Sequence, residues 1–304
     1  MVHPLSIWVL GDGKPGHENQ SLGLAEALGR LHPCAIHPVS LAGTHGLVRR
    51  LRAALGSAGQ LPKPDLILAA GHATHPALLW LARKYHARSI VLMRPSLPLG
   101  WFDLCLAPEH DFSNAPDAAR VITTLGALNR VQLGPPDRRH GSLILVGGPS
   151  SSHDWDESAL LANLAEILPS TADGPWQLAD SRRTPDGLLA RLRESFPGLE
   201  VVHHADTRRE WLPARLAEAN AVWVTEDSVS MVYEALSSGA KVGLLPVPRK
   251  RADTRVLRGI QNLLDRQFIT SFATWRETRE LLAPPHPLRE ADRCAQLVME
   301  RFFT

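Results

Sequence analysis

Short apolar runs alternate with segments of helical periodicity along the chain. In its first part, the apolar runs predict strands over Ser6–Leu10, Asp65–Ala70, Ser89–Met93 and Phe102–Leu106. Apolar residues that repeat every three to four positions predict helices over about 18–31 and 74–85. Strands that alternate with helices in this way are typical of a parallel sheet covered by helices on both faces.

The segment 133–141, LGPPDRRHG, interrupts this pattern with prolines and a charged run, and it predicts a linker. The alternation then starts again. Strands are predicted over Ser142–Val146, Leu199–His203, Ala221–Thr225 and Lys241–Pro246, and helices over about 157–168, 209–219 and 228–238. The tail, 287–303, has the pattern of one amphipathic helix.

The expected fold is therefore α/β, with two doubly wound, Rossmann-like domains over residues 1–136 and 137–286 and a C-terminal helix over 287–304. Two similar α/β halves joined by one linker imply a central cleft, which is where ligands usually bind.

The composition fits a globular protein and narrows its partners. Of the 304 residues, 44% are hydrophobic and 21% are charged, and the net charge is +2. So small a net charge gives no field that would favour nucleic acid, and we expect no nucleic-acid partner. The three cysteines are widely spaced without a C-x-x-C pair, which argues against a disulfide framework or a cysteine-rich zinc site.

Targeting signals are missing from the sequence. No apolar stretch reaches the roughly 18–20 residues that a membrane span requires, and the first residues lack the basic and apolar regions of a signal peptide. The sequence therefore predicts a cytoplasmic protein without a transmembrane segment. Heavy use of arginine and alanine hints at a bacterial source.

The first predicted strand leads into a glycine-rich loop, Gly11-Asp-Gly-Lys-Pro-Gly16, which fits the G-x-G-x-x-G pattern of dinucleotide sites. The acidic residue that such a site needs about 20 positions later is missing, because residues 36–40 are IHPVS. Pro15 also lacks the N–H that could face a pyrophosphate. We therefore expect neither NAD nor any other cofactor.

Polar side chains crowd this loop and the helix start that follows it: Asp12, Lys14, His17, Asn19 and Gln20. A strand's carboxyl end beside a helix N-terminus attracts anions and hosts ligands. His17 is a candidate general base, and His72, in AAGHATHP, follows another predicted strand on the same rim. The alternative is a turn capped by Asp12, with the remaining polar residues on the surface.

Three loops of the second half collect groups suited to phosphate and ribose. They contain Gly147, Gly148 and Ser150, then Arg182 and Arg183, and then Glu226, Asp227, Ser228, Ser230 and Glu234. Glycines allow close approach of the backbone, hydroxyl and guanidinium groups donate to phosphate oxygens, and a helix N-terminus attracts phosphate. The alternatives are ordinary β–α turns with serine or aspartate caps and a solvated basic turn.

The sequence shows none of the usual metal-binding patterns. It has no H-x-x-x-H pair and no cysteine cluster, and Asp227 has no D-x-D partner. We therefore expect no metal site.

Three segments, GDGKPGHENQSLGLAEAL, SRRTP and TEDSVSMVYEALSSGAKVGLLP, resemble in this order the elongated-mitochondria family. That family is named for a plant mitochondrial-fission factor and includes many bacterial proteins proposed to be glycosyltransferases. It is in turn similar to GT-B glycosyltransferases, such as the peptidoglycan N-acetylglucosaminyltransferase that works on a lipid-linked acceptor. The glycine loop ending in His17, the Gly147-Gly148 loop and Glu234 match motifs of that enzyme, with Pro15 and Pro149 as departures.

The resemblance implies a GT-B-like fold whose C-terminal helix crosses back onto the first domain. It also implies an inverting, metal-independent transfer of a sugar from a nucleoside-diphosphate sugar to an acceptor hydroxyl. His17 and Asp12 would be catalytic. The acceptor side would include Gly13, Lys14, Gly16, Asn19, Gln20 and His72. The donor side would include Gly147, Gly148, Ser150, Arg182, Arg183, Glu226, Asp227, Ser228, Ser230, Met231 and Glu234.

The acceptor that the resemblance implies is a lipid-linked or cell-surface glycan precursor, reached through peripheral membrane contact. The plant members, described as fission factors, leave a second interpretation open. In it, the chain is a non-catalytic GT-B-like interaction protein that keeps the fold and the nucleotide pocket. Hydrolysis or transfer of a nucleotide-sugar would separate the two interpretations.

Overall fold

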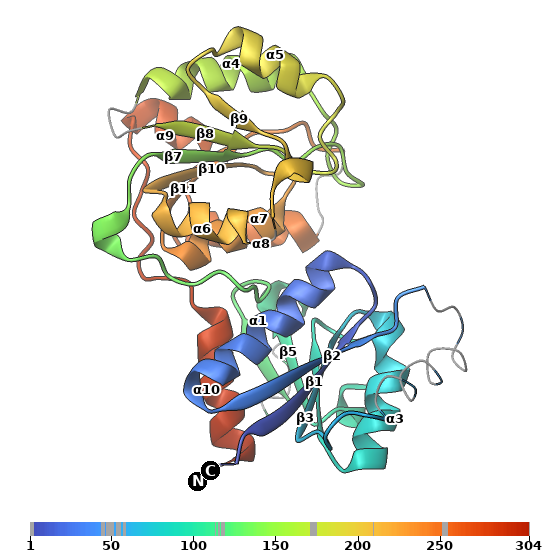
Figure 1. Cartoon of the computed structure of the whole chain (residues 1–304). Helices are drawn as coiled ribbons and strands as arrows, with labels where there is room; N and C mark the ends of the chain where they lie inside the picture. The colour runs from blue at the N-terminus through green and yellow to red at the C-terminus, as the bar shows by residue number, and fades with distance from the viewer. Residues whose placement is uncertain are drawn as a thin grey trace. The chain divides into compact units, whose positions relative to one another are not determined.

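The computed structural model describes residues 3–43, 59–112, 119–170, 175–208, 210–250 and 255–303, and the single residues 46, 52, 56, 114 and 116. They form two units (Figure 1), Met1–Arg130 together with Arg289–Thr304, and Val131–Leu288. We call these unit 1 and unit 2 and describe each by itself.

Unit 1 is built on a parallel sheet with the strand order β2-β1-β3-β4-β5-β6. The strands are β1 (Leu5–Gly11), β2 (Cys34–Ser40), β3 (Leu66–Ala70), β4 (Arg88–Leu92), β5 (Leu104–Pro108) and β6 (Val121–Thr124). Successive side chains point to opposite faces, so β1 sends Ile7 and Val9 into one core and Trp8 and Leu10 into the other. Burial on both faces explains why these strands are continuous apolar runs in the sequence.

Helices cover both faces of this sheet. α1 (Pro15–Leu31) and α10 (Glu290–Phe302) pack on one face, and α3 (His75–Tyr85) packs on the other. Leu24 and Leu28 of α1 lie one turn apart and are fully buried, and each such leucine stabilises the fold by about 1.5–3 kcal/mol. The chain thus returns to unit 1 for its last helix.

Unit 2 repeats the design with the strand order β11-β10-β7-β8-β9, again parallel. The strands are β7 (Ser142–Leu145), β8 (Trp176–Ala179), β9 (Glu200–Val202), β10 (Ala221–Thr225) and β11 (Lys241–Leu245). The helices are α4 (Glu157–Ile167), α5 (Leu188–Ser195), α6 (Trp211–Glu218), α7 (Val229–Ser238), α8 (Arg255–Asp265) and α9 (Phe272–Thr278).

Aromatic packing fills the core on one face of this second sheet. α4, α5 and α9 bury that face, where the rings of Trp223 and Trp275 meet edge to face with centroids 5.2 Å apart. Figure 1 shows α6, α7 and α8 along the other face. Among the helices described in either unit, none is both long and apolar enough to cross a bilayer.

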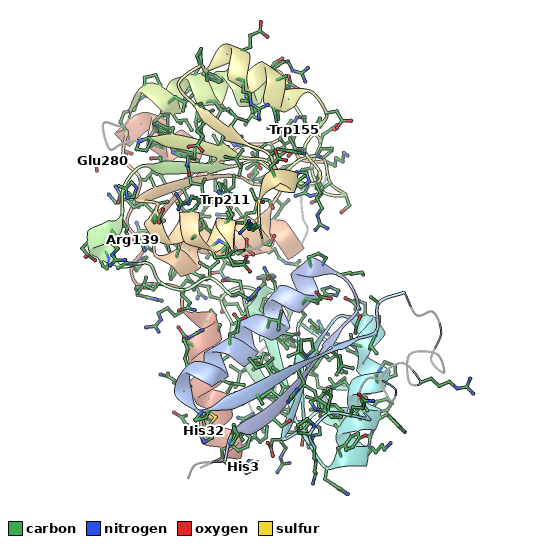
Figure 2. The ribbon with its side chains drawn as sticks, in the orientation of Figure 1. His3, His32, Arg139, Trp155, Trp211 and Glu280 are labelled. Atoms are coloured by element: carbon green, nitrogen blue, oxygen red, sulfur yellow. The ribbon has the colours of Figure 1, made fainter. Side chains whose placement is uncertain are left out.

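The predicted linker, 133–141, is tied to unit 2 along its length. Arg139 (Figure 2) donates hydrogen bonds to the carbonyl oxygens of Ala219 and Ser238, just past α6 and at the end of α7. The backbone N–H of His140 bonds to the carbonyl of Glu218 at 2.8 Å. This segment therefore caps helix ends instead of spanning free solvent.

The fold class is confirmed, since both sheets are parallel and carry helices on both faces. The predicted ranges do not include β2, β6, β8, α5, α8 and α9. The strand predicted over Phe102–Leu106 begins at Leu104, because a 3₁₀ turn ends at Phe102. Of the helix predicted over 209–219, residue 209 lies outside the described residues, and α6 begins at Trp211.

The three cysteines are free thiols. Cys105 and Cys294 are buried, and burial raises the pKa of each thiol to about 12. Both therefore stay protonated and act as small apolar core residues. Cys34 is only half-buried, at the start of β2, and burial again raises its pKa.

Candidate functional site

The loops predicted to bind ligands follow the carboxyl ends of parallel strands in both units. In unit 1, β1 leads into the glycine-rich loop, and its neighbour β3 leads into Gly71 and His72. In unit 2, the loops after β7, β8 and β10 leave the same edge of the sheet. This edge of an open parallel sheet is where ligands usually bind.

Asp12 and His17 form a hydrogen-bonded pair in unit 1. Asp12 Oδ2 lies 2.9 Å from His17 Nδ1, and the two side chains are 5% and 22% exposed, respectively. Asp12 Oδ1 accepts a hydrogen bond from the backbone N–H of Lys14 at 3.1 Å. The carboxylate thus orients the imidazole, keeps a proton on Nδ1 and leaves Nε2 as a proton acceptor.

Gly71 makes room for this pair, and the sequence alone did not single it out. A Cβ at Gly71 would lie 2.3 Å from His17 Nδ1 and 3.0 Å from Asp12 Oδ2. Its φ of +88° is also a value that other residues rarely adopt. Both facts mean that a side chain at this position would displace the pair, so only glycine fits after β3.

His75 is the first residue of α3 and follows the same strand as Gly71. Its side chain is almost fully buried (2% exposed), with ring contacts to His72 and Phe102. Burial, and to a smaller degree the charges of His72 and His17, lower its pKa to about 4. Within the described part of the chain its Nδ1 has no hydrogen-bond partner. His75 is therefore neutral at physiological pH, while His72 is exposed on the rim.

The other predicted residues of this loop differ in accessibility. Gly13, Lys14 and Gly16 are exposed, and Asn19 is half-buried. Gln20 is buried, and its amide donates to the carbonyl of Gly16 and to Met93 Sδ, both at 3.4 Å. Gln20 therefore packs inward, and the expectation that it faces a ligand lacks support from its position.

Asp227 is the centre of the unit 2 loops. Its side chain is fully buried (0% exposed), and Oδ2 accepts hydrogen bonds from Arg183 Nη2 at 2.7 Å and from the backbone N–H of Gly148 at 3.1 Å. Arg183 Nη1 in turn donates to the carbonyl of Gly148 at 2.7 Å. Asp227 Oδ1 lacks a hydrogen-bond partner among the described residues. Asp227 and Arg183 thus bind the loops to one another.

The two glycines after β7 allow this closure. A Cβ on Gly147 would lie 2.2 Å from Asp227 Oδ2, and a Cβ on Gly148 would lie 1.9 Å from the carbonyl oxygen of Arg183. The backbone N–H of Gly147 also donates to Thr225 Oγ1 at 2.8 Å. Loops after three strands are therefore locked together at distances that no side chain would permit.

Glu226 is held in a similar way. It is buried, its Oε2 lies 2.8 Å from Arg249 Nη2, and its Oε1 accepts from the backbone N–H of Val247 at 3.3 Å. Ser228 occupies the N-cap position of α7, but its side chain makes no cap hydrogen bond, so the simple capping alternative is wrong for this residue. The carboxylate of Glu226, like that of Asp227, therefore binds groups inside the protein.

Ser150 and His153 make up the turn after Gly148. Ser150 Oγ accepts hydrogen bonds from the backbone N–H groups of Ser152 and His153, at 3.2 and 3.0 Å. His153, which the sequence interpretation missed, is fully buried, and burial is the main cause that lowers its pKa. The signal that could have indicated it is the polar run SSSHD, which follows the glycines of the loop after β7.

The remaining predicted residues of unit 2 lie at or near the surface. Arg182 and Ser230 are exposed, while Met231 and Glu234 are half-buried on α7. Arg182 differs from its neighbour Arg183 in that its guanidinium has no hydrogen bond or ion pair to the described residues. Of the two arginines, Arg182 is the one available to an anionic ligand.

A group with metal-ligand spacing lies on the ends of the adjoining strands. Asp180, His203 and His204 bring ligand atoms within 4.8 Å of one another. The sequence patterns that predicted no metal site did not cover a histidine pair joined to a distant aspartate. The sequence pattern that could have indicated this group is a pair of histidines after one strand and an aspartate after the neighbouring strand.

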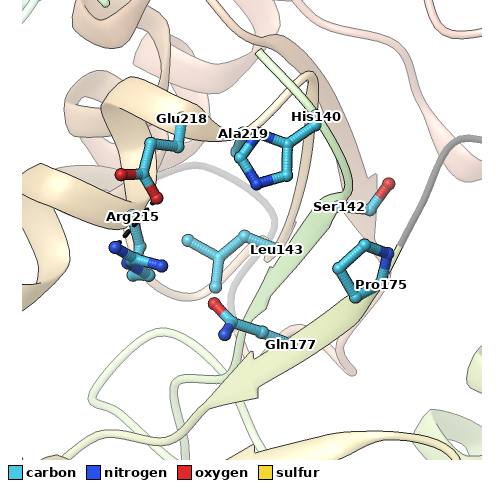
Figure 3. Close-up of a pocket in the computed structure, with 8 residues that line it drawn as sticks. All are labelled: His140, Ser142, Leu143, Pro175, Gln177, Arg215, Glu218 and Ala219. Carbon is cyan, nitrogen blue, oxygen red and sulfur yellow. Dashed lines mark ion pairs between the residues drawn. The ribbon is translucent and has the colours of Figure 1, made fainter. Parts of the chain in front are cut away.

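A cavity of about 130 Å³ opens at the amino ends of the strands in the unit 2 sheet. Figure 3 shows its lining, which includes Ser142 at the start of β7 and an ion pair of 2.8 Å between Arg215 and Glu218. Because it lies at the amino ends of the strands, this cavity is separate from the loops predicted to bind a nucleotide.

Comparison with known proteins decides the family. Residues 15–302 match the family described as Mitochondrial fission ELM1. The chain belongs to this family. A relative from Rickettsia prowazekii (strain Madrid E), an uncharacterized protein named RP120, is 22% identical, with 77% of this chain and 81% of that protein covered.

Solved structures share the fold of this family member. The glycotransferase of kitacinnamycin matches with a TM-score of 0.55 and 17% identity, covering 99% of this chain and all of that one (100%). UDP-GlcNAc 2-epimerase from Methanocaldococcus jannaschii matches with a TM-score of 0.54 and 10% identity, covering 98% and 100%. The family member thus has a GT-B-like fold with two parallel-sheet units, as the resemblance implied.

Proposed function

We propose that the protein is a glycosyltransferase that moves a sugar from a nucleoside-diphosphate sugar to an acceptor hydroxyl. The observation that supports this most strongly is the Asp12–His17 pair, 2.9 Å apart at the carboxyl edge of a GT-B-like unit. A carboxylate that fixes one imidazole nitrogen and leaves the other as acceptor is the arrangement of a general base. The fold supplies a second unit with a polar loop cluster for a donor.

The donor site is proposed in unit 2. The N-terminus of α7 and the backbone after β7 offer dipoles to a diphosphate, and the exposed guanidinium of Arg182 offers bidentate donors. Ser230 lies in the first turn of the same helix and Glu234 one turn later, where its carboxylate would accept hydrogen bonds from a ribose. Asp227, Glu226 and their arginine partners hold these loops in place before the donor arrives.

The proposed reaction gives each of these groups one role. His17 Nε2 takes the proton of the acceptor hydroxyl as the acceptor oxygen forms a bond to the anomeric carbon. The bond from that carbon to the diphosphate oxygen breaks, and the nucleoside diphosphate leaves with both electrons. Attack opposite the leaving group inverts the anomeric configuration. The helix N-terminus and Arg182 stabilise the growing diphosphate charge, so that this step requires no metal.

The acceptor side is proposed in unit 1, around His17, Lys14 and His72. The resemblance to an enzyme with a lipid-linked acceptor suggests a glycan precursor at a membrane surface, met by a protein in the cytoplasm. A non-catalytic interaction protein is the competing interpretation, because the family is described by mitochondrial fission. Such a protein would have no need of an oriented imidazole, which is why the Asp12–His17 pair favours catalysis.

A donor screen tests the proposal. The purified chain is incubated with uridine, guanosine, adenosine and thymidine diphosphate sugars, with and without lipid-linked acceptors, and release of nucleoside diphosphate is followed by chromatography. Release from one donor that His17→Ala abolishes, and that His32→Ala retains, supports a transferase. His32 is a matched control because it lies at the opposite end of α1 (Figure 2). No release from any donor would support the interaction protein.

A further inference from the structure

Three side chains that can ligate a metal meet at the carboxyl ends of two neighbouring strands in unit 2. None of them is among the residues proposed for the donor. Asp180 follows β8 directly and His203 follows β9 directly, and His204 starts the 3₁₀ turn His204–Asp206. β8 and β9 are hydrogen-bonded parallel neighbours, with Ala179 opposite Val202. Chain segments more than 20 residues apart are therefore brought together at one strand edge.

The carboxylate of Asp180 is placed between the two imidazoles. Oδ2 lies 2.8 Å from His203 Nδ1, and Oδ1 lies 3.0 Å from His204 Nδ1. The carboxylate is almost fully buried (4% exposed), while the imidazole side chains of His203 and His204 are 39% and 33% exposed. The two rings contact each other edge to face, with centroids 4.4 Å apart. A buried carboxylate thus holds two partly exposed imidazoles next to each other at the surface.

We propose that Asp180, His203 and His204 form a binding site for a divalent transition metal of the Zn²⁺ class. Two imidazoles with one carboxylate are a ligand set that zinc accepts together with a water molecule. Ligand atoms at about 2.0–2.2 Å from a tetrahedral ion lie roughly 3.4 Å from one another. The observed carboxylate–imidazole separations of 2.8 and 3.0 Å would lengthen by about half an ångström to reach that value, and the three ligand atoms already lie within 4.8 Å of one another.

Metal binding at Nδ1 requires a change of tautomer in each of the two histidines and no net loss of a proton. In the metal-free protein, Nδ1 of each neutral histidine donates its proton to Asp180. When the ion binds Nδ1, that proton is carried on Nε2 instead. The backbone N–H of His204 also donates to Asp180 Oδ1 at 2.5 Å, which helps to fix the carboxylate as an outer partner of the ion would.

The alternative role for Asp180 is purely structural, as an acceptor that ties the turn after β9 to β8. The backbone bond from His204 alone meets that need, whereas the two side-chain bonds add a second and third donor to one carboxylate. Exposure of both histidines leaves coordination positions open to water or a ligand. This inference does not depend on the proposed transferase activity.

The test is zinc binding by the whole chain. Metal-free protein is titrated with Zn²⁺ against a chromophoric chelator, and Co²⁺ is used in parallel for its visible absorption spectrum. We expect one tight ion per chain, a raised melting temperature with Zn²⁺, and a Co²⁺ spectrum typical of nitrogen and oxygen ligands. Asp180→Asn and the double change His203→Ala with His204→Ala should weaken binding by more than the roughly 10–100-fold that loss of an outer partner costs.

His286→Ala is the matched control, since His286 is an exposed histidine of unit 2 outside the cluster. It should bind zinc like the unchanged chain. Asp180→Asn preserves an acceptor for the backbone of His204, so a normal melting temperature without zinc will show that its fold is intact. The proposal is overturned if the unchanged chain binds no zinc at micromolar concentration, or if the cluster variants bind as tightly as the His286→Ala control.

Discussion

The polar loops of the two units look alike in the sequence, yet their side chains have different tasks. In unit 1, Asp12 holds His17 by one ring nitrogen and leaves the other to accept a proton. In unit 2, Arg183 and Asp227 are bonded to each other and to the backbone after β7. The first arrangement leaves one imidazole nitrogen outside the pair, and in the second the charged groups are paired with each other.

The difference shows that charged side chains clustered at the end of a strand can have one of two roles. Some charged side chains remain accessible to a ligand, and others are paired inside the protein and hold the loops together. Burial separates them, because a fully buried carboxylate must find partners inside the protein. For the proposed donor site in unit 2, we therefore assign the ligand contacts to the exposed Arg182 and to the start of α7.

The largest expected effect is on turnover in unit 1. His17→Ala removes the proposed base, and turnover with the preferred donor and acceptor should fall roughly 10²–10⁴-fold. Asp12→Asn should have an effect of similar order, because an amide no longer fixes the tautomer. Both variants should bind nucleoside diphosphate normally, since the donor is proposed on the other unit. Unchanged kinetics of His17→Ala would remove His17 from the mechanism and make His72 the base to test.

The second effect is on stability in unit 2. Asp227→Ala leaves Arg183 and the N–H of Gly148 without their acceptor, and the free energy of unfolding should fall by about 1–3 kcal/mol. Denaturant unfolding followed by circular dichroism measures it. Asp186→Ala, an exposed aspartate nearby, is the control and should have no measurable effect. Equal stability of both variants would mean that the loops of unit 2 are not held by Asp227.

The third effect depends on pH and concerns His75. Burial lowers its pKa from 6.5 to about 4 in the folded protein. Below pH 6.5 the unfolded chain takes up a proton that the folded chain does not, so stability falls as the pH decreases towards 4. The full loss is roughly 3 kcal/mol. His75→Leu cannot titrate and should lose correspondingly less in this window. Identical pH dependence of both proteins would show that His75 is not held neutral.

The smallest effect separates two adjacent arginines. Arg182→Ala should weaken nucleoside diphosphate binding roughly tenfold, the value of one charge-assisted contact, without a change in melting temperature. Arg183→Ala should instead lower the melting temperature, because the buried carboxylate of Asp227 loses its charged partner. Calorimetry and thermal unfolding of both variants measure the pair. The opposite pattern would exchange the roles assigned to the two residues.

The sequence predicts the sheets well and the site less well, for physical reasons. Buried parallel strands are apolar runs, so β1 and β10 lie where the pattern places them. β6 and α9 are short, and their residues are not arranged in a clear period. α1 begins at Pro15, before the predicted start at 18, because proline suits the first turn of a helix.

Roles within the loops depend on contacts between distant residues. The roles of Gly71 and of the Asp180 cluster follow from distances across neighbouring strands, which no local pattern contains. The inward position of Gln20 likewise depends on a contact with Met93, which directly follows β4 and is far from Gln20 in the sequence. Such contacts arise only when the chain folds, which is why polar residue types identified the loops but not the task of each side chain.

Direct titration of nucleoside diphosphates is the decisive measurement. Isothermal calorimetry with uridine and guanosine diphosphate should show one site per chain, with a Kd below about 1 mM for at least one of them. Glu234→Ala should weaken binding of that nucleotide more than binding of pyrophosphate, because the carboxylate is assigned to the ribose. Absence of heat with every nucleoside diphosphate at millimolar concentration, in protein that is fully folded, would contradict the proposed donor site.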